Sequence, residues 1–251
     1  MNSKIRIGIV TPTYRRELLL KLFIRNVRSQ SYRYWNLCIV HDGENEATRS
    51  MVNEFAARDP RLHYLETPNR ANDFGVTPRL LGMTQGLSGR GCDYLVFWDD
   101  DNYFYHNALR SIARSLSAAN YPDLLLVPIH YREKILPADK PASELEKAEL
   151  DAANLVVRYD LACQHYQIVE GRCKSGANAY NQDFLLFEEV SRAVPAQSLA
   201  VAHTKPIALY DGMLRDVRFQ HIRRSWHVPQ LYILSRIPWY RDFVARTSKD
   251  R

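Results

Sequence analysis

The chain has 251 residues, 46% of them hydrophobic, so it can bury one large core or two small ones. It carries 34 Lys and Arg residues against 28 Asp and Glu residues. The resulting net charge of +6 suits acidic ligands such as nucleotides, but it is too mild to indicate nucleic acid binding without an aromatic and basic motif, which we do not find. The four cysteines match no zinc spacing, and we see neither a secretory leader nor an apolar run long enough to cross a membrane. We therefore expect a reduced, cytoplasmic protein.

Apolar strand-like segments alternate with amphipathic segments along the first hundred residues. Strands are predicted at residues 5–10, 35–40, 61–66 and 93–98. Helices are predicted at residues 17–28, at 46–58 and from about 78 to 85. This alternation predicts an α/β fold with a doubly wound, mostly parallel sheet flanked by helices.

Four glycines, Gly82, Gly86, Gly89 and Gly91, lie close together just before the strand at residues 93–98. A dinucleotide fingerprint needs its glycines between a strand and the helix that follows it. We therefore expect this cluster to end a helix and to turn the chain into the next strand.

Three consecutive carboxylates, Asp99, Asp100 and Asp101, follow the apolar strand at residues 93–98. Adjacent negative charges repel one another unless a cation shares them, and aspartate oxygens are hard ligands suited to Mg²⁺ or Mn²⁺. Ligands of open α/β sheets sit beyond the carboxyl ends of the strands, which is where the triplet falls. Alternation along an extended chain would place Asp99 and Asp101 on one side and Asp100 elsewhere. The alternative is a solvated acidic turn.

Further motifs follow the other strands. The first strand leads into the segment Thr11-Pro12-Thr13-Tyr14-Arg15-Arg16, the second into His41-Asp42-Gly43, and Arg79 lies on the helix before the acid triplet. In this order the motifs resemble those of the inverting, metal-dependent GT-A glycosyltransferases of family 2. The chain departs from the family pattern at His41 and at Leu80, where the family has Asp and Asn.

This resemblance implies roles for the motif residues. Asp42 would accept a hydrogen bond from the nucleotide base; by itself it could also be a helix N-cap. Arg79 would reach the base or the diphosphate, or else lie on a solvated helix face. Asp99 would contact the ribose or a metal-bound water, and Asp101 would bind a Mn²⁺ or Mg²⁺ ion that bridges the diphosphate. The remaining residues expected to bind the nucleotide sugar are Thr11, Pro12, Thr13 (through a backbone amide left available in a loop), Tyr14, Arg15 and Asp100.

The second half is predicted to contain a helix at residues 106–119, a strand at 123–128, a polar excursion at 134–153 and a loop at 172–180. A helix running to Ala193 then begins near Asp183, in a segment similar to the family's E-D-x-x-L element. The resemblance implies that Asp183 is the general base, kept ionised by the positive end of the helix. Asp183 could instead be an ordinary helix charge, with Glu188 or Glu170 as the base.

The last forty residues contain His221 in a segment similar to the family's R-x-H-x-x-S. His221 would complete the metal shell or contact the diphosphate, or else be structural, with His203 and His227 as competitors. The basic tail, residues 231–251, is expected to dock on the protein itself; peripheral contact with the inner face of a membrane is the alternative.

Together these patterns predict a single GT-A domain over residues 1–251. Residues 1–101 would form a nucleotide-binding half and residues 102–251 an acceptor-binding half that ends in the tail. The expected activity is metal-dependent, inverting transfer of a sugar from a nucleotide-diphosphate donor to a glycan or lipid-linked saccharide. The expected donor is a UDP-sugar. The alternatives are a catalytically silent subunit that binds nucleotide sugars and a sugar-phosphate nucleotidyltransferase.

Overall fold

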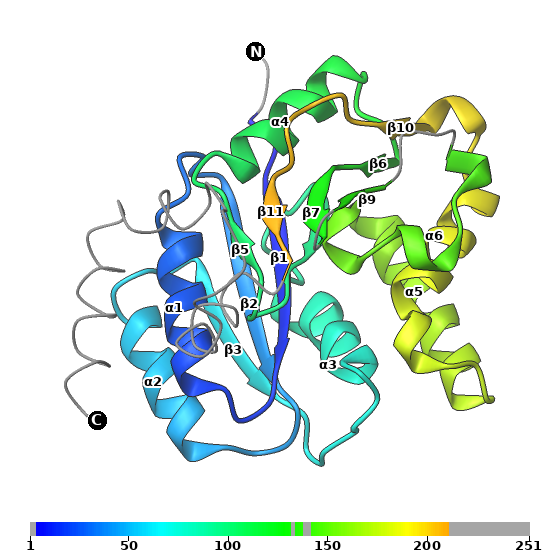
Figure 1. Ribbon diagram of the computed structural model, residues 1–251. Helices are drawn as coiled ribbons and strands as arrows, with labels where there is room; N and C mark the ends of the chain where they lie inside the picture. The colour runs from blue at the N-terminus through cyan, green and yellow to red at the C-terminus, as the bar shows by residue number, and fades with distance from the viewer. Residues whose placement is uncertain (1–3, 132–133, 138–141, 211–251) are drawn as a thin grey trace, which may run out of the picture. The chain divides into compact units, whose positions relative to one another are not determined.

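The computed structural model describes residues 4–131, 134–137 and 142–210. In this part of the chain, seven strands form the main sheet (Figure 1). Their spatial order is β10 (Leu199–Val201), β6 (Leu124–Leu126), β9 (Leu155–Arg158), β4 (Tyr94–Phe97), β1 (Ile7–Thr13), β2 (Trp35–His41) and β3 (Leu62–Glu66). Only β9 runs antiparallel to its neighbours, so the predicted, mostly parallel α/β sheet is confirmed.

Helices cover both faces of this sheet (Figure 1). Because side chains alternate along a strand, Ile7 and Ile9 pack in one core while Val10 packs in the other. The first core includes residues of α1 (Glu17–Arg28), α2 (Glu46–Ala56) and α4 (Ala108–Ala118), and the second includes residues of α3 (Val76–Leu81), α5 (Tyr159–Lys174) and α6 (Gln182–Ala193). All seven residues of β2 are buried, as expected of a central parallel strand.

The observed elements differ from the predicted ones in two places that matter for the site. β1 continues through Thr11 and Pro12 to Thr13, because β2 still pairs with it there, so the predicted loop begins three residues later. The predicted loop at residues 172–180 is wrong at its start, since α5 continues to Lys174.

The glycine cluster ends a helix, as predicted. α3 continues directly into one π-helical turn, Gly82–Gly86, and the chain then bends toward β4. Gly89 and Gly91 take positive φ angles of 70° and 64°, a region that glycine enters at little cost.

Gly86 also marks a close approach between this turn and β2. We expect Gly86→Ala to lower the free energy of unfolding by about 1–3 kcal/mol, because the added methyl group would clash with Cys38 Sγ. The matched control is Gly171→Ala in α5, where the added methyl group meets no described atom within 4 Å apart from its chain neighbours and the backbone of its own helix. This control is expected to gain roughly 0.5–1 kcal/mol from helix propensity. Urea unfolding measures both, and equal stability of the two variants would contradict the account.

The sheet opens between β1 and β4. These strands pair only as far as Val10 and Phe97, whereas β1 and β2 stay paired to Thr13 and His41. β1 is also the strand at which the order reverses, with β2 and β3 on one side and β4 on the other. A crevice at such a switch point is where doubly wound sheets bind their ligands.

A second sheet, absent from the sequence predictions, lies beside the first. Its order is β5 (Tyr103–Phe104), β11 (Ala208–Leu209), β7 (Ile129–Tyr131) and β8 (Lys134–Leu136). These strands have two or three residues each, too few to show a period in the sequence. In the part of the chain that the structure describes, no helix has the length and apolar character needed to cross a membrane.

Candidate active site

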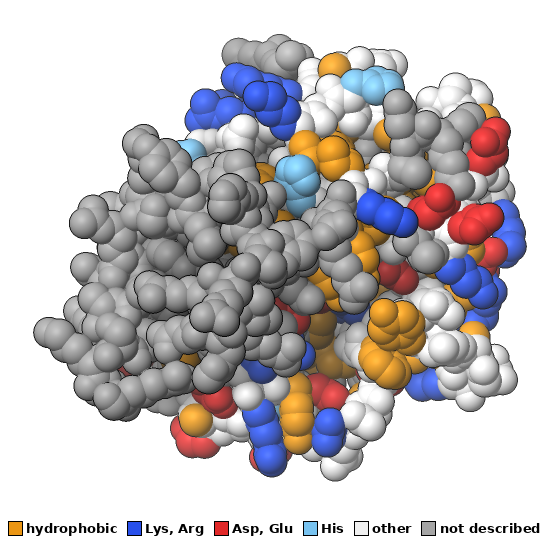
Figure 2. All heavy atoms as spheres, in the orientation of Figure 1, with side chains coloured by type: hydrophobic (Ala, Val, Ile, Leu, Met, Phe, Trp, Pro, Cys, Tyr) orange, Lys and Arg blue, Asp and Glu red, His pale blue; other side chains and the backbone are white. Residues whose placement is uncertain are grey.

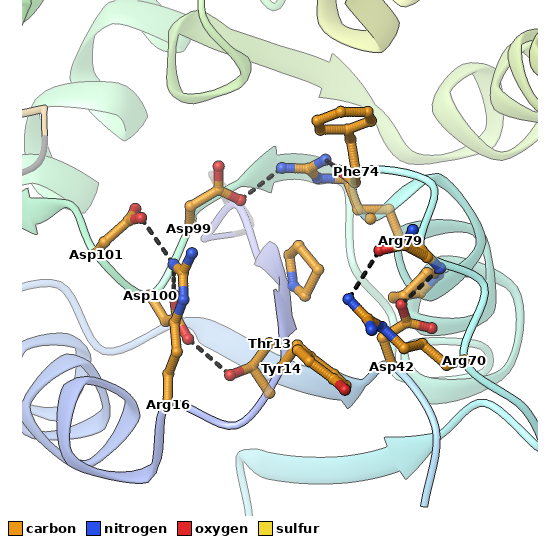
Figure 3. Close-up of a pocket in the computed structure, with 14 residues that line it drawn as sticks. Thr13, Tyr14, Arg16, Asp42, Arg70, Phe74, Arg79, Asp99, Asp100 and Asp101 are labelled. Carbon is orange, nitrogen blue, oxygen red and sulfur yellow. Dashed lines mark hydrogen bonds and ion pairs between the residues drawn. The ribbon is translucent and has the colours of Figure 1, made fainter. Parts of the chain in front are cut away.

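A pocket of about 420 Å³ lies at the carboxyl ends of β1, β2 and β4 (Figure 3). Its walls come from the segments that follow these strands and from the loop that leads into α3. The lining residues are Pro12, Thr13, Tyr14, Arg16, Asp42, Arg70, Asn72, Phe74, Gly75, Pro78, Arg79, Asp99, Asp100 and Asp101.

The acid triplet forms a turn directly after β4, closed by a hydrogen bond from Asn102 N to Asp99 O. Asp100 is 2% exposed and accepts a hydrogen bond of 2.6 Å from the Thr13 hydroxyl. Asp99 and Asp101 point away from Asp100 (Figure 3). Asp100 is therefore the carboxylate directed into the protein, while Asp99 and Asp101 lie on the pocket wall.

Two arginines neutralise the triplet in this structure. Arg16 Nη1 lies 3.1 Å from Asp100 Oδ1 and 2.8 Å from Asp101 Oδ2, and Arg79 Nη2 lies 2.5 Å from Asp99 Oδ1. Burial alone would lower the pKa of both arginines, but the neighbouring carboxylates outweigh it and raise the pKa. Burial raises the pKa of Asp100 to about 7, against the opposing effect of Arg16. Arg79 is 4% exposed, so it does not lie on a solvated helix face.

The carboxylate oxygens on this wall are suitable ligands for a divalent cation whose remaining coordination sites are filled by a bound substrate. Among the described residues, no group of three or more His, Cys, Asp or Glu side chains is arranged to hold a metal by itself. Mg²⁺, however, usually binds through one or two carboxylates, with waters and substrate phosphates completing the shell. Asp99 and Asp101 supply such oxygens on the pocket wall. His221 and His227 lie outside the described residues.

The other end of the pocket is built around the ring of Tyr14. The Arg70 guanidinium carbon lies 4.0 Å from its centroid and that of Arg15 lies 5.3 Å away, while the His41 ring is at 5.6 Å. Arg15 takes a positive φ of 49° and donates its backbone N–H to His41 Nε2 at 3.0 Å. This end presents aromatic and cationic surface of the kind that a nucleobase can stack on.

Asp42 holds the loop that closes this end. Its Oδ1 accepts from Ala71 N at 2.7 Å, and its Oδ2 accepts from Asn72 N at 2.9 Å. Asp42 is not a helix N-cap, because the side chain of Asn45 caps α2 by accepting from Thr48 N.

Asp42 should therefore contribute to stability as well as to binding. We expect Asp42→Ala to lower the free energy of unfolding by about 2–3 kcal/mol, because two backbone amides lose a charged acceptor. Urea unfolding measures the change. The exposed neighbour Glu44 provides the control, since Glu44→Ala should stay within about 0.5 kcal/mol of the wild type. The role given to the Asp42 carboxylate fails if both variants are equally stable.

The structure brings most of the predicted site residues together on the pocket wall, and two of the predicted nucleotide contacts are not part of its lining. Thr11 is fully buried inside β1, and neither Thr11 nor Arg15 lines the pocket. The predicted residues that do line it are Pro12, Thr13, Tyr14, Asp42, Arg79, Asp99, Asp100 and Asp101. Thr13 contributes its hydroxyl from within β1, so the expectation of a loop residue with an available amide is corrected.

Asp183 is the second residue of α6, as predicted, and lies outside the pocket lining. Burial raises its pKa to about 6, against the lowering effects of Phe184 N–H and of Arg79, and the charge of Asp99 adds to the rise. Burial thus outweighs the lowering effect of the helix end, which was expected to keep this carboxylate ionised. The other two candidate bases pair with cations: Glu188 with Arg172 and Arg192, and Glu170 with Lys174.

The first turn of α6 is fastened to the pocket wall. The Gln182 amide donates to Phe74 O, and the Tyr166 hydroxyl donates to Gln182 Oε1. Arg79 Nη1 donates to the same Phe74 carbonyl at 3.2 Å. These bonds connect the helix that carries Asp183 to the residues that surround Asp99.

Another acid near Asp99 and Asp183, Asp151, was missed by the sequence analysis. Burial raises its pKa to about 7, helped by the charges of Asp99 and Asp183. Asp151 caps the short 3-10 helix Ala152–Asn154, which leads into β9 beside β4. In the sequence it ends a polar stretch predicted only as an excursion, and nothing local marks it as part of a site.

Other lining residues were also not assigned from the sequence. Arg16 is the last residue of the motif at residues 11–16, so the motif could have identified it as a site residue. Pro78 lines the pocket from the first turn of α3. The other lining residues that were not assigned come from the loop before this helix: Arg70, Asn72, Phe74 and Gly75.

Comparison of the sequence with known proteins shows the family to which the chain belongs. The sequence model of "Glycosyl transferase family 2" matches residues 8–154, which contain every lining residue of the pocket. A Campylobacter jejuni GalNAc(5)-diNAcBac-PP-undecaprenol beta-1,3-glucosyltransferase is 22% identical over 107 residues, which are 43% of this chain and 33% of that protein. The putative teichuronic acid biosynthesis glycosyltransferase TuaG of Bacillus subtilis is 24% identical over 101 residues, 40% of this chain and 38% of that protein. The chain spans 15–39% of the length of these and similar curated relatives.

Solved structures share the fold. S. aureus TarS 1-349 in complex with UDP superimposes with a TM-score of 0.62 and 12% identity, covering 82% of this chain and 60% of that chain. The same protein in complex with UDP-GlcNAc gives a TM-score of 0.60 and 13% identity, covering 82% of this chain and 58% of that chain.

Proposed function

Because the chain belongs to glycosyl transferase family 2, we propose that it transfers a sugar from a nucleotide-diphosphate donor to a saccharide hydroxyl, with inversion at the anomeric carbon. The observation that carries the proposal is the acid triplet, which lies in the crevice between β1 and β4 together with a cationic and aromatic pocket. UDP-sugar is the donor we expect, in view of the TarS structures with UDP and UDP-GlcNAc.

In this proposal the two ends of the pocket bind different parts of the donor. Tyr14 and Arg70 stack on the base, and Asp42, which already holds the backbone of residues 71–72, accepts from the base with a remaining lone pair. The diphosphate lies toward Asp99 and Asp101. Arg79 stays with Asp99 and balances its charge.

A Mn²⁺ or Mg²⁺ ion would be held by Asp101 and Asp99, and when bound it would offset negative charge on the departing nucleotide diphosphate. Arg16, now paired with Asp101, would keep its second partner, Asp100. It would thereby hold the triplet turn in place as Asp101 turns to the ion.

Asp183 acts as the base in this scheme. The acceptor oxygen forms a bond to the anomeric carbon while its proton passes to the Asp183 carboxylate, and the bond from the anomeric carbon to the diphosphate oxygen breaks. Inversion requires a base on the face of the sugar opposite the nucleotide. The raised pKa suits this role, since a carboxylate with a pKa near 6 binds a proton more readily than an ordinary one.

The raised pKa of Asp183 also predicts a pH dependence. We expect kcat/KM for transfer to rise as the pH increases through about 6 and to level off above it, because only the ionised carboxylate accepts the proton. Asp99, Asp151 and Arg79 face this group, so the apparent pKa belongs to the cluster. A pH–rate profile measures it. A rate that does not change between about pH 5 and pH 8 would contradict the assignment of Asp183.

Release of nucleotide diphosphate tests the proposed function. The full chain is incubated with UDP-, GDP- and TDP-sugars and Mn²⁺, with and without saccharide acceptors. We expect slow donor hydrolysis to the nucleotide diphosphate and free sugar, and faster release with an acceptor. Pyrophosphate released from a nucleoside triphosphate and a sugar phosphate would instead identify a nucleotidyltransferase. Donor binding without any release, across the whole panel, would identify a silent binding subunit.

A further inference from the structure

Two exposed aromatic rings lie in contact at the edge of the pocket. Phe74 and Tyr180 are each 64% exposed, and their ring centroids lie 5.6 Å apart in an edge-to-face arrangement with an interplanar angle of 80°. Large aromatic side chains are usually buried in soluble proteins, so a contacting pair this exposed needs an explanation. Figure 2 shows that hydrophobic side chains are exposed on the face of the molecule seen in Figure 1, with acidic and basic side chains around them.

The backbone holds Phe74 in this position at an energetic cost. Phe74 takes a φ of +57°, which is rare for a bulky residue, and Asn72 and Gly75 also have positive φ angles. The Phe74 carbonyl accepts hydrogen bonds from both Arg79 and Gln182, which fix the strained residue. Such strain persists only where the surroundings impose it, and it is concentrated at functional sites.

The pair joins the proposed donor pocket to the segment that carries the proposed base. Phe74 lines the pocket, and its ring lies next to Arg79 and points away from Tyr14 and Asp42 (Figure 3). Tyr180 lies in the 3-10 helix Ala179–Asn181, three residues before Asp183. An acceptor must reach both the donor and the base, and the contact between the two rings joins the pocket lining to the segment that leads into Asp183.

From these observations we infer that Phe74 and Tyr180 form an acceptor subsite that stacks on the apolar face of a pyranose ring. The inference rests on the proposed function and names the acceptor subsite of that site. Aromatic faces bind the C–H face of a sugar, while nearby polar groups bind its hydroxyls. Here Asn72 lies two residues before Phe74 and Asp183 lies three residues after Tyr180. An acyl chain would need a larger continuous apolar surface than two rings flanked by polar side chains.

Saturation-transfer NMR on the full chain tests this inference. The probes are methyl α- and β-glycosides of glucose, galactose and N-acetylglucosamine, mixed with UDP and Mg²⁺. We expect signals from at least one glycoside, strongest for the C–H protons of one ring face. Phe74→Ala and Tyr180→Ala should each lower the ratio of glycoside to UDP signal by about two- to tenfold, the range that one aromatic contact supplies. Phe74→Tyr and Tyr180→Phe should restore the ratio.

Tyr121 offers a matched control, because it is also an exposed aromatic residue with a positive φ and lies just before β6, at the opposite end of the strands. Tyr121→Ala should leave the ratio unchanged. Two results would overturn the inference: UDP signals without any glycoside signal in the wild type, or glycoside signals that survive both alanine substitutions. The proposed function itself is at fault if UDP gives no signal with the wild type, whatever the glycosides do.

Discussion

Asp183→Asn is expected to fold normally and to lower kcat for sugar transfer by about 10²–10⁴-fold, because the acceptor hydroxyl loses the group that takes its proton. Asparagine keeps the size of the side chain and can still accept from Phe184 N. It also removes a carboxylate whose burial raises its pKa, so stability should not fall. Single-turnover transfer at saturating donor measures the effect, and donor affinity should change little because Asp183 does not line the pocket.

A carboxylate on the same helix separates this role from general effects of charge. Glu188 is held by Arg172 and Arg192, and Glu188→Gln should keep nearly full activity. Near-normal turnover by Asp183→Asn, or an equal loss in both variants, would refute Asp183 as the base.

Asp101→Asn is expected to remove the increase in UDP affinity that Mn²⁺ produces. We expect UDP binding in the presence of Mn²⁺ to weaken by about 100-fold, or ~2.7 kcal/mol, because the ion loses a charged ligand. Metal-free UDP binding should persist, since Arg16 keeps its partner Asp100 and the turn keeps its bond from Thr13. Calorimetric titration with and without Mn²⁺ measures the two affinities.

The control for this substitution is Asp160→Asn, which removes an exposed carboxylate in the first turn of α5. Its Mn²⁺-dependent affinity should equal that of the wild type. If Asp101→Asn keeps the full Mn²⁺ effect, the ion does not bind at this carboxylate.

Local patterns in the sequence predicted the doubly wound α/β sheet, and the resemblance of its motifs to family 2 implied the GT-A fold; both are confirmed. Short apolar runs and helical apolar spacing locate β1 to β4 and their helices, and the rule that ligands sit at strand ends locates the pocket. The antiparallel strand β9 and the second sheet were not predicted, because both depend on pairing between short strands that are distant in sequence.

The predicted site residues were identified from sequence motifs. Their hydrogen-bond and ion-pair partners could not be identified in this way, because they are distant in sequence and meet only in the folded chain. Arg16 meets Asp100 across 84 positions, and Gln182 meets the Phe74 carbonyl across 108. Burial is likewise a property of the fold. The sequence therefore indicated only the helix end beside Asp183 and missed the desolvation that raises its pKa.

The left-handed conformation of Phe74 has no local signal, because nothing in its residue type favours a positive φ. Two hydrogen bonds to the Phe74 carbonyl, from Arg79 and Gln182, hold the residue in this conformation. A sequence pattern can thus predict which chemical groups a site contains, but not the contacts that hold those groups in position.

The central claim is that the acid triplet binds a divalent cation together with a pyrophosphate. Calorimetric titration of the full chain with UDP, in the presence and absence of Mn²⁺, tests it most directly. The account predicts tighter binding with Mn²⁺, and a smaller gain or none with the Asp101→Asn variant. The claim would be contradicted if neither Mn²⁺ nor Mg²⁺ strengthened the binding of any UDP-, GDP- or TDP-linked ligand.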